Sequence, residues 1–376
     1  MDRRLLKNID FTIIIAVVIL IIFGLIVIYS VSSTNPNLLK ITGNNPWYFT
    51  KKQLSAIFIG IIGFLILLQF DYRLSKRMNI LLYCFNIFVL GLVLVIGSTR
   101  SGAKSWLFGF QPSELSKLLL IVTFGNYLAT KESLNSYYDF IMPFLYMGLP
   151  LFLILLQPDL GTALVYIFFM FIMMYIAGAP GRKLIVVFLI PVIGVALLFL
   201  LHNYFGTPLP IKPYQIARLT SFIDPERDPQ GSGWHVIQSQ IAVGSGQFFG
   251  KGWLKGTQGR LGFLPEPHTD FVFANLCEEF GFVGGFGVLF LFFILIWRGI
   301  HIAVQARDKT GSIIAAGIVA MWLFHILENA GMNIGLMPIT GIPLPFVSYG
   351  GTSMLVNILS TAVLMNIWVR HQKIMF

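Results

Sequence analysis

Apolar stretches of membrane-spanning length recur along the whole chain, separated by short polar segments. An α-helix needs about 17 to 25 such residues to cross a hydrocarbon core roughly 30 Å thick. The pattern predicts an all-α integral membrane protein, a bundle of about ten transmembrane helices that forms a single polytopic domain over residues 1–376. The fourth stretch is short and begins among charged residues. The predicted spans are 11–31, 54–70, 80–97, 115–128, 140–156, 161–177, 184–201, 271–298, 313–332 and 352–369.

Composition agrees with this class. Hydrophobic residues make up 56% of the 376 residues and charged residues 11%, against roughly 25% charged residues in a soluble domain. The first apolar stretch follows a basic start, but it is too long for a signal peptide and no small-residue cleavage site follows it. Cys84 and Cys277 fall in different predicted helices without metal-ligand spacing, which favours buried, unreactive thiols.

The distribution of Lys and Arg predicts the orientation, because basic residues in short loops stay on the cytoplasmic side. Ten crossings place both termini on one side, and most basic residues of the short loops fall there. Both termini of this multi-pass membrane protein are therefore expected in the cytoplasm. The net charge of +10 then indicates orientation and attraction to anionic lipid, and no nucleic-acid partner. The basic residues in question include Arg73, Lys76, Arg77, Arg182, Lys183, Arg307 and Lys309.

The longest polar segment, residues 203–270, is predicted to be a large extracytoplasmic loop between helices seven and eight. It ends in Phe-Leu-Pro-Glu-Pro-His-Thr-Asp, which delivers Glu266, His268 and Asp270 to the mouth of a membrane helix. The loop is rich in aromatic residues, so it is expected to be ordered. Its cations Arg218, Lys251 and Arg260 could bind the phosphates of a lipid headgroup. The plain alternative for Asp270 is an N-cap on helix eight.

A second polar segment, Gln-Pro-Ser-Glu-Leu-Ser-Lys, spans residues 111–117. The proline predicts a helix start, and Glu114 falls in the first turn, where the helix dipole favours an anion. Glu114 and Lys117 share a face at i, i+3, so a local ion pair is one interpretation. An ammonium that enters the membrane normally faces the bundle interior and needs an anionic partner, which favours a functional role for Lys117.

Two further segments interrupt the apolar pattern on the same side. Residues 157–162 read as a tight turn in which Asp159 is expected to cap the next helix. Residues 338–351 contain three prolines and several glycines and cannot form a regular helix. Irregular backbone at membrane depth is tolerated only inside protein or along a cavity, so this segment is predicted to form a re-entrant groove wall.

These segments, taken in order, resemble the SEDS family (shape, elongation, division and sporulation proteins) over essentially the whole chain. Residues 256–258 and 261–265 look more like the elongation-type member, RodA, than the division-type FtsW. The matching stretches are Gln111 to Lys117, Pro158 to Thr162, Arg218 with Phe222, Asp224-Pro225, Asp228-Pro229, Gly233, Gln238-Ser239, Gly250 to Gly252, Leu264 to Phe271, Glu278 to Gly281 and Gly341 to Gly351.

The resemblance implies a peptidoglycan glycosyltransferase that polymerises lipid II into β-1,4 glycan strands on the outer face of the bacterial cytoplasmic (inner) membrane. Such a transfer needs a carboxylate to accept the hydroxyl proton and positive charge to stabilise the departing diphosphate. Asp270 fits the first role. Lys117 and Arg218, with a divalent cation (Mg or Mn) as an open possibility, fit the second. Glu114, Glu266 and Lys251 are the further candidates for substrate binding, together with Lys104, since Ser105 stands where the family commonly has arginine before Trp106.

The resemblance also implies a membrane partner, a class B penicillin-binding protein transpeptidase, along with other membrane proteins of the elongation complex. A glycan polymerase by itself makes no crosslinks. Two rival functions suit the same helices: a flippase that moves lipid II across the membrane, and a scaffold that only anchors the transpeptidase. The chain lacks two matched broken helices in its two halves, the usual sequence pointer to alternating access.

Overall fold

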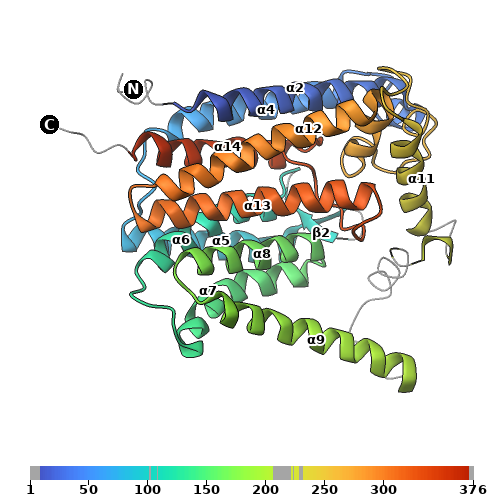
Figure 1. The fold of residues 1–376 in the computed structure, drawn as a ribbon. Helices are drawn as coiled ribbons and strands as arrows, with labels where there is room; N and C mark the ends of the chain where they lie inside the picture. Colours follow the sequence, from blue (N-terminus) through green and yellow to red (C-terminus); the bar gives the residue numbers. More distant parts are fainter. Residues whose placement is uncertain are drawn as a thin grey trace.

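The computed structural model describes residues 9–100, 103–107, 109–205, 222, 224–227 and 232–371. All ten predicted spans are helices in it, so the predicted all-α bundle is confirmed (Figure 1). Eight of them are long and apolar enough to cross a membrane, while α8 has only 17 residues and α6 carries two charged residues near its start. The ten are α2 (Phe11–Thr34), α4 (Tyr48–Leu67), α5 (Lys76–Ile96), α6 (Pro112–Ala129), α7 (Tyr137–Leu156), α8 (Leu160–Ile176), α9 (Gly181–Phe205), α12 (Val272–Gln305), α13 (Lys309–Asn333) and α14 (Gly351–Val369).

Short elements connect these helices. An antiparallel hairpin of β1 (Ser98–Arg100) and β2 (Ala103–Trp106) precedes α6, and the all-α prediction had no place for it. α3 (Pro36–Ile41) follows α2, and the 3-10 turn η1 (Pro225–Arg227) lies in the long loop. α11 (Ser232–Ser245) crosses the end of the bundle in Figure 1, where it packs on α12 and α13. The long loop, which was expected to be ordered, therefore contains a helix within its described residues.

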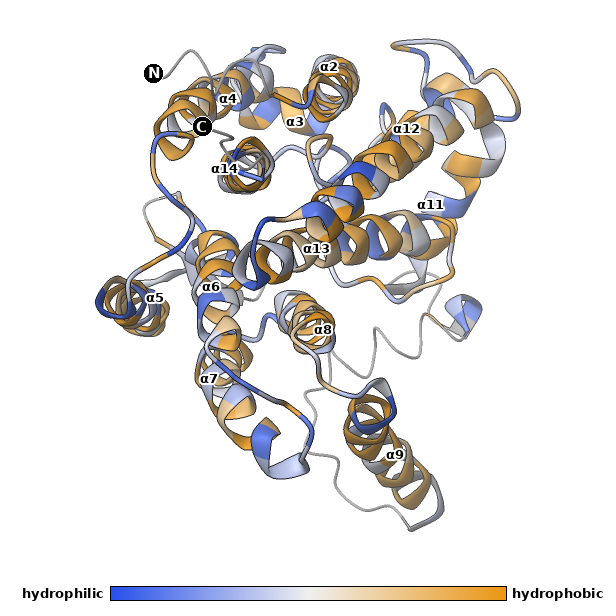
Figure 2. Cartoon of the chain, turned by 60° about the vertical axis from the view of Figure 1, so that its left-hand side comes forward, coloured by the Kyte–Doolittle hydropathy of each residue, from blue (hydrophilic) through white to orange (hydrophobic). Residues whose placement is uncertain are grey.

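α13 is the central helix of the bundle. It packs against α12, α8 and α6 and lies among them in Figure 2. Small residues allow this close approach: a Cβ added at Gly317 would lie 2.7 Å from Met173 Sδ and 2.9 Å from Ile121 Cγ2. Such substitutions would force the helices apart, because helix contacts in membranes depend on small residues at the crossing.

α9 contrasts with α13. It packs mainly on α8 and stands away from the other helices in Figures 1 and 2. In its membrane-spanning window 6% of the residues are buried, against 72% in α13. Its outward Leu, Ile and Val side chains suit contact with lipid, so α9 is held by the bilayer more than by protein.

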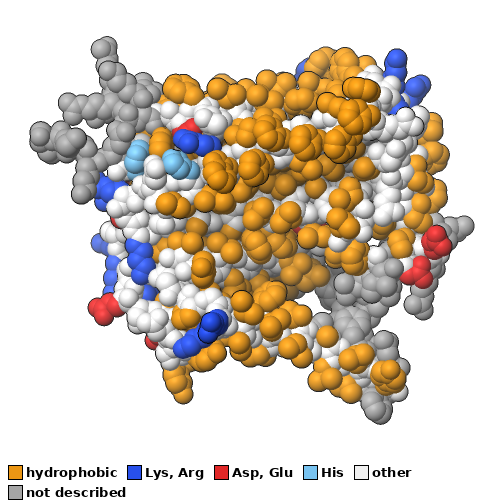
Figure 3. Space-filling view, viewed as in Figure 1, with side chains coloured by type: hydrophobic (Ala, Val, Ile, Leu, Met, Phe, Trp, Pro, Cys, Tyr) orange, Lys and Arg blue, Asp and Glu red, His pale blue; other side chains and the backbone are white. Residues whose placement is uncertain are grey.

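The two ends of the described chain lie at the same end of the bundle. The Asp10 N–H lies 3.3 Å from Met365 Sδ, and the Arg298 guanidinium donates hydrogen bonds to the Asp10 carboxylate. An even number of crossings, as predicted, requires this arrangement. Figure 3 shows hydrophobic side chains over the middle of the bundle, with most of the visible Lys and Arg side chains toward its ends, as expected for a multi-pass membrane protein.

Candidate functional site

The site begins at the first turns of α6. Pro112 occupies the first helical position, where its missing N–H costs nothing. The N–H of the preceding Gln111 donates to Thr352 Oγ1 at 3.1 Å, which ties the start of α6 to the start of α14. The next turn therefore projects Glu114 and Lys117 from a fixed position into the bundle.

Glu114 and Lys117 form a buried ion pair. Lys117 Nζ donates to Glu114 Oε1 at 2.7 Å, and the two residues are 1% and 4% exposed respectively. The prediction that the lysine faces the bundle interior is confirmed. Two charges removed from water are costly unless further hydrogen bonds compensate them, so additional partners are expected here.

His325 of α13 supplies one of these partners, and sequence analysis missed it. Its Nδ1 lies 3.0 Å from the Pro343 carbonyl oxygen, and its Nε2 lies 3.0 Å from Lys117 Nζ. A carbonyl can only accept, so Nδ1 carries the proton and the Nε2 lone pair accepts from the ammonium. A signal was present in the sequence: an ionisable residue inside a predicted membrane helix, as His325 and Glu328 both are, is a functional candidate by default.

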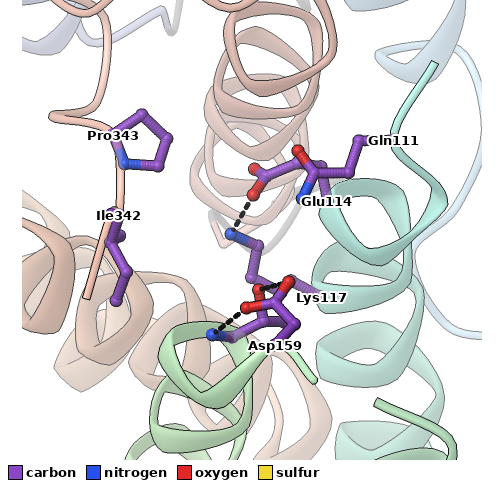
Figure 4. Close-up of a pocket in the computed structure, with 8 residues that line it drawn as sticks. Gln111, Glu114, Lys117, Asp159, Ile342 and Pro343 are labelled. Carbon is purple, nitrogen blue, oxygen red and sulfur yellow. Dashed lines mark hydrogen bonds and ion pairs between the residues drawn. The ribbon is translucent and has the colours of Figure 1, made fainter. Parts of the chain in front are cut away.

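A small polar cavity of about 50 Å³ lies beside this pair (Figure 4). Three elements converge on it: α6, the start of α8 and the irregular segment before α14. The cavity has room for a few water molecules and is far smaller than the roughly 300 to 1,000 Å³ of a typical ligand pocket. It is lined by Gln111, Glu114, Lys117, Asp159, Thr162, Gly341, Ile342 and Pro343.

Asp159 has the capping role that the sequence predicted. Its carboxylate accepts from the Thr162 N–H at 3.0 Å and from Thr162 Oγ1 at 2.8 Å, and α8 begins one residue later. The same side chain also lines the cavity. Capping and a place at the site are therefore compatible at this position.

The Pro/Gly-rich segment forms one wall of the cavity, and residues 338–350 have no regular helix, as predicted. Its backbone polar groups are satisfied inside the protein. The Ile342 carbonyl accepts from Asn329 Nδ2 at 2.8 Å, the Ser348 carbonyl from Gln53 Nε2 at 3.1 Å, and the Tyr349 N–H donates to the His268 carbonyl at 2.9 Å. Irregular backbone can persist at this depth because protein groups replace the missing helical bonds.

Asp270 lies against this wall. A Cβ added at Gly341 would lie 3.2 Å from Asp270 Oδ2, and Gly341 has φ +77°, which favours glycine. The N-cap position expected for Asp270 is instead occupied by the next residue: the N-cap of α12 is Phe271. The structure thus brings the carboxylate next to the lining of the cavity that holds Lys117.

The remaining sequence candidates are distributed differently. Glu266 is solvent-exposed. His268 packs against the rings of Phe49 and Tyr349, and burial lowers the pKa of its imidazole to about 4. Lys251 of the long loop forms an ion pair with Glu278 of α12 at 2.6 Å. Arg218 lies outside the described residues, as does the side chain of Lys104, whose backbone is part of β2.

The described part of the chain contains no group of three or more His, Cys, Asp or Glu side chains that could hold a metal ion. Glu114 and Asp159 both line the cavity, but each already accepts hydrogen bonds from protein donors. Mg²⁺ is commonly held by one or two carboxylates together with substrate phosphates. Glu114 and Asp159 are the carboxylates of the cavity lining that could contribute oxygen ligands to such a cation.

The fold and the site define a polytopic helical membrane protein in which the buried Lys117 and Glu114 line one cavity with Asp159, and Asp270 lies against its Gly341 wall. A model of the FtsW/RodA/SpoVE family, described as cell cycle protein, matches residues 11–373. The chain belongs to this family, which confirms the resemblance seen in the sequence.

Relatives of known name cover nearly the whole chain. Stage V sporulation protein E of Bacillus subtilis is 38% identical over 95% of this chain and 96% of its own. Peptidoglycan glycosyltransferase MrdB of Escherichia coli K12 is 33% identical over 98% and 95%. RodA of Thermus thermophilus, a rod shape determining protein, matches in structure with a TM-score of 0.68 at 26% identity, over 96% of each chain. A structure described as the structural coordination of polymerization and crosslinking by a peptidoglycan synthase complex matches with a TM-score of 0.76 at 28% identity, over 96% and 98%.

Proposed function

We propose that this protein is a peptidoglycan glycosyltransferase that polymerises lipid II into β-1,4 glycan strands and serves cell elongation. Relatives named peptidoglycan glycosyltransferase MrdB and RodA, at 33% and 34% identity, support the activity. One structural observation carries the proposal: the Asp270 carboxylate lies against Gly341, in the wall of the cavity that also contains the Lys117 ammonium. A candidate base, Asp270, thus lies next to the wall of the cavity that Lys117 lines.

The proposed reaction requires both groups. The 4-hydroxyl of an acceptor sugar attacks the anomeric carbon of a donor sugar, the bond to the polyprenyl diphosphate breaks, and the new bond has inverted configuration. In our scheme Asp270 accepts the hydroxyl proton, a contribution typically worth about 10² to 10⁴ in rate. Positive charge held near the leaving diphosphate stabilises the electrons it takes away.

Lys117 is suited to the second role because it is already oriented. Glu114 and His325 hold its Nζ at 2.7 Å and 3.0 Å, so the ammonium need not reorganise as the diphosphate leaves. A fixed charge in a water-poor site stabilises a transition state more than a mobile one does. Arg218 and Lys104 remain proposed further contacts to the diphosphate, and Glu114 acts on the substrate through Lys117. A divalent cation, in this scheme, enters only with the diphosphate.

The proposed setting follows from charge and from the relatives. Both termini lie in the cytoplasm, so the α11 end of the bundle and the cavity beside it face the outer leaflet. The match to a peptidoglycan synthase complex supports a class B penicillin-binding protein as the partner. We further propose that other membrane proteins of the elongation complex bind the pair.

The test is polymerisation of labelled lipid II by the purified protein with its partner, comparing wild type with Asp270→Asn. The amide keeps the size of the side chain but cannot accept the proton, so we expect a rate loss of about 10² or more. The control is Glu226→Gln, which alters an exposed carboxylate of the same long loop and should leave the rate within about twofold.

Normal glycan synthesis by Asp270→Asn would exclude Asp270 as the base. If the wild-type protein with its partner makes no polymer but moves lipid II across vesicle membranes, the flippase interpretation holds instead.

A further inference from the structure

A polar stripe runs along one face of α13, a helix whose other buried residues are apolar apart from Glu328. His325, Asn329 and Asn333 follow one another at intervals of four residues, so they lie on one face of the helix. They are buried, with exposed fractions of 3%, 0% and 0%. Polar groups at this depth are costly unless each finds a partner, so the partners indicate what the stripe does.

Asn329 uses its amide nitrogen to join two distant segments. Nδ2 donates to the Asp270 carbonyl at 3.0 Å and to the Ile342 carbonyl at 2.8 Å, which uses both of its hydrogens. Ile342 lines the cavity. One side chain therefore ties the backbone that carries the catalytic carboxylate to the wall beside it.

Asn333 reinforces the same joint from the next turn. Its Nδ2 donates to the Asp270 carbonyl at 3.2 Å, and its Oδ1 accepts from the Ala274 N–H at 3.2 Å in the first turn of α12. At the other end of the stripe, His325 donates to the Pro343 carbonyl and accepts from Lys117. The stripe thus contacts the Lys117 ammonium at one end and the backbone carbonyl of Asp270 at the other.

We infer that this stripe is a positioning device, which fixes the Asp270 carboxylate relative to the Lys117 ammonium, and that Asn329 is its central positioning residue. The inference rests on the proposed function. A misplacement of about 1 Å at a reacting group can cost on the order of 10² in rate, so a bridge between the segments that carry both groups bears directly on turnover.

Asn357 of α14 shows what a purely structural asparagine in this bundle looks like. It is 4% exposed, its Nδ2 donates to the Ser353 carbonyl of its own helix, and its Oδ1 accepts from Trp322 Nε1 at 2.9 Å. It joins one regular helix to another. Asn329 instead serves carbonyls of two irregular segments at the site, so Asn357 is the matched control.

The experiment is a mutant cycle of Asn329→Ala and Asp270→Ala, measured as kcat and KM for lipid II polymerisation by the purified protein with its partner. We expect Asn329→Ala alone to lower kcat about tenfold or more with little change in KM. In the Asp270→Ala background the same change should cause almost no further loss, because there is no carboxylate left to position. Asn357→Ala should leave kcat per folded molecule near wild type in both backgrounds.

If the double variant lost kcat by the product of the two single-variant factors, the inference would be overturned, while Asp270 would remain the base. Full activity of Asp270→Ala alone would instead remove the proposed base, and the inference with it. If the alanine variant folds poorly, Asn329→Asp serves in its place. A protonated carboxyl keeps the shape and donates to one carbonyl only, so its loss of kcat should lie between wild type and alanine, and wild-type activity would contradict the inference.

Discussion

Two lysine–glutamate pairs in this protein look alike in distance and differ in everything around them. Lys117 and Glu114 are 2.7 Å apart beside the cavity, and Lys251 of the long loop and Glu278 of α12 are 2.6 Å apart. Both glutamates are buried. The sequence analysis placed both lysines among the substrate-binding candidates, so the contrast shows which features separate a site from a structural anchor.

The loop pair is saturated by its own surroundings. Glu278 Oε1 also accepts from the N–H and Oγ1 of Thr257, both at 2.8 Å, and Gln258 N–H donates to the same carboxylate at 3.1 Å. These contacts fasten residues 251–258 to α12. The Lys117–Glu114 pair instead contacts His325 of α13. It lines a cavity enclosed by α6, the start of α8 and the irregular segment before α14.

A break in α12 explains why an anchor is needed there. Gly281 has φ 68° and ψ −163°, so the helical hydrogen bonds lapse around it. The long loop replaces these helical hydrogen bonds. The N–H groups of Lys251 and Gly252 donate to the carbonyls of Glu278 and Glu279 at 2.9 and 3.0 Å. On the other side of the break, Phe282 and Val283 donate to loop carbonyls. The Lys251–Glu278 pair therefore stabilises the junction between the long loop and α12 at this break.

The largest effect is expected from Lys117→Ala. It removes the oriented cation from the proposed leaving-group site, and loss of one such stabilising group typically costs about 10² to 10³ in rate. Lys117→Arg should not restore activity, because a planar fork does not reproduce a compact point charge. The measurement is lipid II polymerisation with membrane insertion checked in parallel. Full glycan synthesis by Lys117→Ala would show that Lys117, like Lys251, is only a structural anchor.

The sequence predicted the fold and the contents of the site more fully than their connections. Ten apolar stretches were enough to predict the helices, and the charged turns identified Lys117, Glu114 and Asp270. His325 and Asn329 were missed because a polar residue in an apolar helix gives no sign of which distant backbone it will meet. The β1–β2 hairpin was missed because its short strands show no alternation strong enough to predict a sheet.

Glu278→Ala should reduce stability far more than catalysis. It leaves the part-buried N–H donors of Thr257 and Gln258 and the Lys251 ammonium without their acceptor, at a cost of about 1 to 3 kcal/mol in unfolding free energy. Thermal unfolding of the purified protein in detergent measures this loss. Polymerisation per folded molecule should stay within about threefold of wild type, and a loss comparable with that of Lys117→Ala would assign the loop pair to the reaction.

Acid should lower the free energy of unfolding through protonation of His268. Burial lowers the pKa of this imidazole to about 4, whereas in the unfolded chain it is about 6.5. The unfolded chain therefore binds the proton first, so stability is complete above pH 6.5 and falls as the pH drops toward 4. Between pH 7 and 5 the loss should be about 2 kcal/mol. His268→Phe keeps a ring between Phe49 and Tyr349, and its thermal stability should depend less on pH, which an unchanged profile would contradict.

The smallest effect is expected from Lys251→Ala, the matched partner of the first substitution. The side chain of Lys251 is 28% exposed, so water replaces part of what the ammonium loses. Thr257 and Gln258 still donate to Glu278 after the change. We expect a loss of about 1 kcal/mol in stability and polymerisation within about twofold of wild type. A rate loss on the order of 10² from this loop lysine, with stability unchanged, would show that it binds substrate directly, and the environment of the two pairs would then not distinguish anchor from site.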